Sequence, residues 1–212
     1  MYLILVVLAI VFAYTIRRKS VLEKQVNLFK RLLYIEKNPE KYIAEVDKLL
    51  MRMLSEKEKN INLIQKTTGL FYAGEFSEAI DILTEQVTKI PPNWQVIYYH
   101  NMLLSMYFNG SIEKANEVLD DVRATIDKYY SRDYNKITIE LIYAVSDFYN
   151  GNISKCREFF NNLIEAAGND YRISIGYYFK SRILEMQDKL EDAEDSMEEA
   201  RNYGHGSFIE KL

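Results

Sequence analysis

One short pattern occurs four times in the sequence, and it constrains the fold more than any other feature. Each copy has a turn residue, an apolar residue two positions later and a small residue five positions later. The small residues are Ala79, Ala115, Cys156 and Ala193, with spacings of 36, 41 and 37 residues. Self-similarity at such a period is typical of helical hairpins that stack along the chain and bury one face against the next hairpin. The pattern therefore predicts an all-α array.

The composition agrees with helices rather than sheets. The 212 residues include only 8 glycines and 3 prolines, whereas β-sandwiches and β-barrels need many turns. Hydrophobic residues make up 48% of the chain, which is enough for a packed core. We therefore expect several long helices joined by short turns.

The repeated pattern resembles the tetratricopeptide repeat, a helix–turn–helix unit of about 34 residues. The resemblance covers about residues 60–204, and Pro91 lies where that repeat usually places a proline between units. It rests on the four small residues together with the turn residues and the apolar residues that follow them, which are Gly74, Gly110, Gly151, Asp188, Phe76, Ile112, Ile153 and Leu190. Gln86, Asp147 and Asp188 depart from the family pattern, and the spacings exceed 34 residues.

The resemblance implies an α-solenoid whose first helix in each hairpin lines a concave, peptide-binding groove. Counting back from the small residues places eleven positions on this groove: Phe71, Tyr72, His100, Leu104, Tyr107, Phe108, Val145, Phe148, Tyr149, Tyr178 and Arg182. They are mostly apolar and aromatic, which favours an apolar helix or extended protein segment as the partner. Arg182 is the one candidate for the carboxylate clamp that some relatives use. The alternative is that these aromatic residues only pack between repeats.

The N-terminus predicts a membrane anchor. Residues 1–16 carry no charged side chain and would span about 24 Å as a helix, and Arg17, Arg18 and Lys19 follow them. We expect a transmembrane helix over residues 1–18, with the N-terminus outside and a cytoplasmic repeat domain, because basic flanks favour the cytoplasmic side. A cleaved signal peptide and a buried helix are the alternatives.

The rest of the chain divides by charge and by helix signals. Residues 17–66 have a net charge of +6 and residues 67–212 a net charge of −10. The acidic charge of residues 67–212 argues against nucleic acid as a partner, because phosphate contacts need clustered Lys and Arg. We expect a basic helical hairpin over 19–57, four repeats over 58–204 and a C-terminal tail over 205–212. Asn38–Pro39 indicates one helix start, and the capping box Ser55–Glu58 indicates the next.

No catalytic or cofactor motif is present in the sequence. One cysteine and two histidines leave little for a metal site, so we expect no catalytic residue, metal or cofactor. Ser111 is expected to cap a helix, and Cys156 to be a small core residue.

These features predict a non-catalytic, membrane-anchored adaptor or scaffold that binds a protein partner. The alternatives are a self-associating component of a membrane or envelope assembly, which would make the chain a homo-oligomer, and an enzyme. Asp147 and Glu185 are the best carboxylate candidates for an enzyme.

Overall fold

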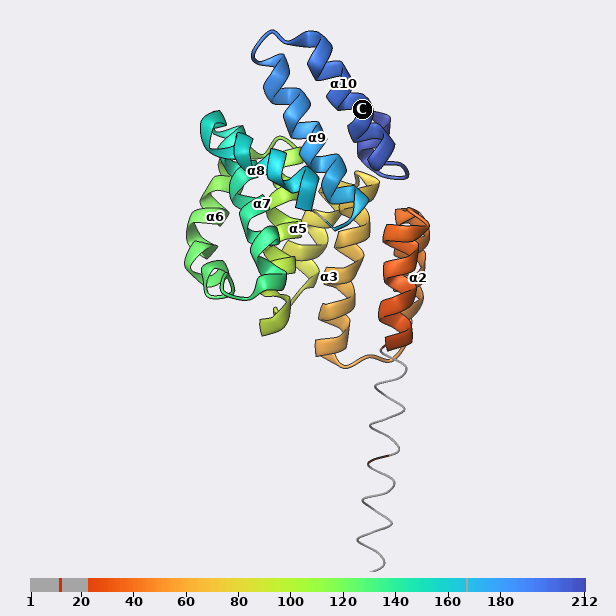
Figure 1. Ribbon diagram of the computed structural model, residues 1–212. Helices are drawn as coiled ribbons and strands as arrows, with labels where there is room; N and C mark the ends of the chain where they lie inside the picture. Colours follow the sequence, from red (N-terminus) through yellow and green to blue (C-terminus); the bar gives the residue numbers. More distant parts are fainter. Residues whose placement is uncertain (1–11, 13–22, 167) are drawn as a thin grey trace, which may run out of the picture.

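The computed structural model describes residue 12, residues 23–166 and residues 168–212. Every regular element in these ranges is a helix (Figure 1). Most of the helices pair into antiparallel hairpins along the chain. In order, the elements are η1 (Arg31–Ile35), α2 (Pro39–Leu50), α3 (Glu56–Ala73), α4 (Phe76–Asp81), η2 (Ile82–Gln86), η3 (Pro92–Trp94), α5 (Gln95–Phe108), α6 (Ile112–Asp127), α7 (Asp133–Tyr149), α8 (Ile153–Ala166), α9 (Asp170–Glu185), α10 (Leu190–Tyr203) and η4 (Phe208–Lys211).

The four repeated turns have the same backbone conformation. Gly74, Gly110 and Gly151 have φ angles of 87°, 78° and 77°, and Asp188, which replaces the turn glycine, has φ 58°. Aspartate is one of the few residues other than glycine that tolerates this left-handed region. The small residue that follows each turn is buried, with at most 2% of its surface exposed. The sequence pattern therefore corresponds to one local structure made four times.

Two of the three predicted helix starts have the expected capping contacts. Ser55 accepts a hydrogen bond from the backbone N–H of Glu58, whose side chain accepts one from the Ser55 N–H, so the capping box is present. Asn38 accepts from the backbone of Lys41, one turn into α2. Ser111 precedes α6 as expected, but its side chain makes no capping hydrogen bond. The position of Ser111 as the N-cap is therefore confirmed, whereas the capping hydrogen bond is absent.

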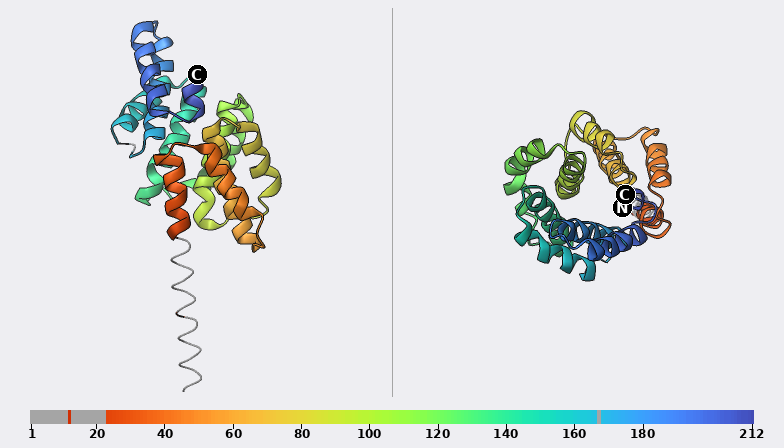
Figure 2. Two further views of the ribbon diagram at one scale, coloured as in Figure 1. Left: turned by 90° about the vertical axis from the view of Figure 1, so that its right-hand side faces the viewer. Right: turned by 90° about the horizontal axis from the view of Figure 1, so that it is seen from above.

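The array curves until its last hairpin meets its first (Figure 2). The ring of Tyr72 in α3 stacks on that of Tyr171 in α9, with centroids 4.4 Å apart. The Lys37 ammonium lies in the turn between η1 and α2 and contacts the Asp170 carboxylate at 2.7 Å. These contacts bring helices from the two ends of the described chain together.

The expected C-terminal tail is packed into the array as a closing segment, residues 204–212. Phe208 exposes only 7% of its surface, and its ring lies 5.7 Å from that of Phe71, 5.0 Å from Phe76 and 5.1 Å from Phe108. Gly206 has φ 78°, and a Cβ there would lie 1.8 Å from the carbonyl oxygen of Lys37. The segment therefore bridges the middle of the array and the first hairpin.

The expectation of a transmembrane helix is corrected. Within the residues that the structure describes, no helix is both long and apolar enough to cross a membrane. The predicted span over 1–18 and its flanking residues Arg17, Arg18 and Lys19 lie outside the described residues. The described fold is therefore all-helical without a membrane-spanning helix, and it does not support the predicted single-pass membrane protein.

Candidate functional site

A cavity of about 370 Å³ lies where the two ends of the array meet, and we call it the inner cavity. Its walls come from the helical residues 23–35, α2, α3, η3, α5, α7 and α9. Val26 and Lys30 are exposed and line it, so this helical segment forms its mouth. Its volume lies within the range of ligand pockets, about 300–1,000 Å³. Since both ends of the array contribute, the closure of the array creates this cavity.

Aromatic rings form much of the wall. Tyr34, Tyr42, Tyr72 and Trp94 line the inner cavity, and Tyr42 and Tyr72 are buried. Burial raises the pKa of the Tyr34, Tyr42 and Tyr72 hydroxyls, so all three stay protonated at neutral pH. The wall is therefore an apolar surface that carries neutral hydroxyl groups, which suits side chains of mixed polarity.

A buried polar network supports the floor. The Asn101 side-chain amide nitrogen lies 3.1 Å from the hydroxyl of Thr67, 2.9 Å from that of Thr68 and 3.3 Å from the carbonyl oxygen of Ile64. The Asn101 carbonyl oxygen lies 3.1 Å from Nδ1 of His100. Burial, together with a smaller effect of the charge of Arg172, lowers the pKa of His100 to about 4. His100 is therefore neutral at pH 7.

Arg172 brings a positive charge to the wall. Its Nη2 donates a hydrogen bond of 2.8 Å to the hydroxyl of Thr138 in α7, which orients the guanidinium group. Its backbone N–H donates to the side chain of Asn169, the N-cap of α9. Gln65, in the α3 wall, has a buried Oε1 that accepts no hydrogen bond from the described residues. The inner cavity thus offers a fixed cation, and the Gln65 oxygen lies buried behind its wall.

The structure divides the eleven predicted groove residues into three groups. Phe71, Leu104, Tyr107 and Val145 are fully buried in the core, with 0% exposed. Tyr72 and His100 line the inner cavity. The others lie toward the C-terminal ends of α5, α7 and α9 and are half-buried or exposed: Phe108, Phe148, Tyr149, Tyr178 and Arg182.

The half-buried residues form an aromatic cluster that the closing segment partly covers. Phe108 contacts Tyr149 and Tyr178, with ring centroids 6.4 Å and 5.7 Å apart, and Phe208 packs on the same ring. Arg182 pairs with Glu185 on its own helix. Packing between repeats therefore accounts for a large part of the aromatic content at these positions.

Sequence reasoning missed several residues of the inner cavity. Lys30, Tyr34, Gln65, Trp94 and Arg172 line it, but none belongs to the groove register transferred from the repeat. Lys30 and Tyr34 precede the repeats, and Arg172 reaches the cavity because α9 returns to the first hairpin. Trp94 is the one tryptophan of the chain. This rarity is the only sequence signal that could have drawn attention to any of these five cavity residues.

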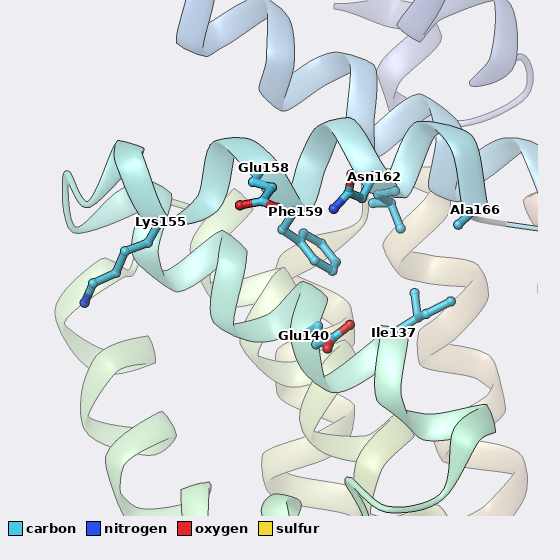
Figure 3. Close-up of a pocket in the computed structure, with 8 residues that line it drawn as sticks. Ile137, Glu140, Lys155, Glu158, Phe159, Asn162 and Ala166 are labelled. Carbon is cyan, nitrogen blue, oxygen red and sulfur yellow. The ribbon is translucent and has the colours of Figure 1, made fainter.

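A second pocket of about 350 Å³ lies between α7 and α8 (Figure 3). Phe159 points from α8 toward Ile137 and Glu140 of α7, and Lys155 and Glu158 lie along the same side (Figure 3). The pocket belongs to a single hairpin and carries charges of both signs. The inner cavity is the stronger candidate because it combines an aromatic wall with positive charge and lies where the two ends of the array meet.

No family model, curated protein or solved structure matches this chain. The tetratricopeptide resemblance therefore stays a prediction. In the described ranges, no group of three or more His, Cys, Asp or Glu side chains is placed to hold a metal ion. Of the carboxylates considered for catalysis, Asp147 accepts a hydrogen bond from Asn152, and neither Asp147 nor Glu185 lines the inner cavity.

Proposed function

We propose that this protein is a non-catalytic binding protein, an adaptor or scaffold of tetratricopeptide-like hairpins that holds a segment of a protein partner in the inner cavity. The observation that carries the proposal is the inner cavity itself, with its aromatic wall and buried polar floor. Helical arrays typically bind extended or helical segments on their inner surface, where rigid hairpins present side chains from several repeats. The shared conformation of the four turns supports the repeat assignment.

The chemistry of the inner cavity favours binding over catalysis. The pKa of His100 is lowered to about 4, which makes this imidazole a weak base, and its Nδ1 is engaged by Asn101. Cys156 is buried after the third turn, and burial raises the pKa of its thiol. Raised thiol pKa values disfavour the reactive thiolate. We therefore interpret both groups as parts of the structural framework.

The test uses the full chain and a library of randomised decapeptides that are acetylated and amidated. We expect the protein to enrich a set of related sequences. Val26→Tyr adds bulk at the mouth of the cavity, at a side chain that is 44% exposed, and it should weaken binding of the enriched peptides. Leu190→Tyr makes a comparable change at a 70% exposed position of α10 and should leave binding intact.

The library experiment can also refute the proposal. No enrichment by the wild-type chain, or equal binding by the Val26→Tyr and Leu190→Tyr variants, would contradict the proposal. Circular dichroism melting curves of both variants establish that each is folded before binding is compared.

A further inference from the structure

The inner cavity has the opposite charge to the molecule that contains it. The chain has a net charge of −4, yet Lys30 and Arg172 line the cavity, and none of its described lining residues is Asp or Glu. Two carboxylates on the adjoining segments are paired with other side chains: Asp170 with Lys37, and Glu36 with Arg31 and Lys41. Because His100 is neutral, Lys30 and Arg172 set the sign of the charge that a ligand meets at pH 7.

We propose that the inner cavity selects protein segments that carry an acidic side chain beside an apolar one, with Arg172 binding the carboxylate. This inference rests on the proposed function and names the chemistry of the partner. Charge complementarity is the main argument, since a carboxylate on the ligand supplies the negative charge that the cavity wall lacks.

The position of Arg172 suits this role. Its bond to Thr138 holds one side of the guanidinium group, which reduces the entropy lost when the group binds a ligand. A planar guanidinium binds a carboxylate through two parallel N–H···O bonds, a geometry that an ammonium group does not provide. The charge of Arg172 also opposes the rise in the pKa of Tyr34 and Tyr72. Arg172, Tyr34 and Tyr72 all line the same cavity, so its charge lies at the aromatic wall.

One further feature completes the recognition. Tyr72 and Trp94 provide the apolar surface against which an aliphatic or aromatic side chain of the segment packs. A carboxylate beside an apolar side chain describes an acidic segment of mixed polarity.

The experiment begins with the peptides enriched by the full wild-type chain. We expect Asp or Glu beside Leu, Ile, Phe, Tyr or Trp in the enriched set. Replacing the acidic residue of an enriched peptide by its amide should weaken binding at least about tenfold, as expected for the loss of a charge-assisted hydrogen bond. Enriched peptides without an acidic preference would overturn this inference and leave the proposed function standing, whereas no enrichment at all would overturn the proposed function.

Variants test whether Arg172 causes the acidic preference. Arg172→Glu should shift the enriched set toward Lys and Arg, and Arg157→Glu, the same charge change at an exposed position of α8, should leave the acidic preference unchanged. If Arg172→Glu does not fold, Arg172→Gln replaces it and should bind the acidic peptide and its amide equally. An acidic preference that survives at Arg172→Gln would overturn the assignment.

A competition measurement separates a protein segment from a free anion. Glutarate and inorganic phosphate should displace an enriched peptide only weakly, because neither fills the space along the aromatic wall. Displacement by either anion as effective as that by unlabelled peptide would overturn the inference, since the inner cavity would then recognise the anion alone.

Discussion

The ring of Tyr72 in α3 stacks on the ring of Tyr171 in α9, with centroids 4.4 Å apart and an angle of 29° between the planes. This pair joins the first described repeat to the last one, and Tyr72 also lines the inner cavity. The stacking therefore connects the closure of the array to the formation of the candidate site. Residues that maintain closure should affect binding even where they do not touch a ligand.

A substitution at Gly206 tests the close contact between the closing segment and Lys37. Gly206→Ala would place a Cβ 1.8 Å from the carbonyl oxygen of Lys37, in a residue with φ 78°. Gly151→Ala is the matched control, because Gly151 has φ 77° and a Cβ there would meet no atom within 4 Å. Both variants bear a left-handed strain of about 1–2 kcal/mol, and overpacking adds about 1–3 kcal/mol at Gly206 alone. Urea unfolding measures the difference, and equal losses at both sites would contradict the contact with Lys37.

A substitution at Phe208 tests whether the closing segment packs into the array. Phe208→Ala removes a buried ring that contacts Phe71, Phe76 and Phe108, and we expect it to lower the free energy of unfolding by about 3–5 kcal/mol. Leu212→Ala, at a 55% exposed side chain of the same segment, should change it by less than about 0.5 kcal/mol. A Phe208→Ala variant as stable as Leu212→Ala would show that the segment does not pack into the array in solution.

His100 makes the stability depend on pH. Its pKa is about 4 in the folded protein, below the ordinary value of 6.5, because burial disfavours the charged ring. Between these two values the unfolded chain therefore binds a proton that the folded chain does not bind. The resulting stabilisation is fully present above pH 6.5 and falls by up to about 3 kcal/mol as the pH is lowered to 4.

A variant isolates this effect from the carboxylates that titrate over the same range. In His100→Gln, stability should fall less steeply between pH 6.5 and pH 4 than in the wild type, as measured by urea unfolding at a series of pH values. The His100 ring protons should titrate near pH 4 by NMR. A midpoint near 6.5 would contradict the burial of this ring.

The two serines that precede helices provide a test of the helix starts. Ser55→Ala removes a complete capping box and should cost about 1 kcal/mol of stability. Ser111→Ala removes a side chain that makes no capping hydrogen bond and should cost only a few tenths of a kcal/mol. Thermal unfolding of both variants measures the contrast, and the reverse order would show that the contact at Ser111 forms in solution.

Local features of the fold could be predicted from the sequence because each depends on a few neighbouring residues. The capping box at Ser55, the helix start at Pro39 and the turn at Gly74 are set by sequence spacing. The turn at Asp188 followed from the register of the repeat, although the glycine is missing. These local features are the ones that the structure confirms.

Long-range features could not be predicted, because they depend on how small rotations accumulate along the array. Phe208 and Ile209 form a short apolar pair without helical periodicity, so nothing in the sequence indicated that they pack into the array, where Phe208 contacts Phe71. Arg172 and Lys30 line one cavity only because the ends of the array meet. Register alone also placed Leu104 in the groove, although its side chain packs fully inside the core.

Trp94 offers the most direct measurement of the central claim that a protein segment binds in the inner cavity. It is the single tryptophan of the chain and lines that cavity, so its fluorescence reports occupancy without a label. Titration with an enriched peptide that lacks tryptophan should give a saturable change in Trp94 emission in the wild type and in Leu190→Tyr, and a much weaker response in Val26→Tyr. Peptide binding that is detected by anisotropy of a labelled peptide but leaves Trp94 emission unchanged would contradict the claim.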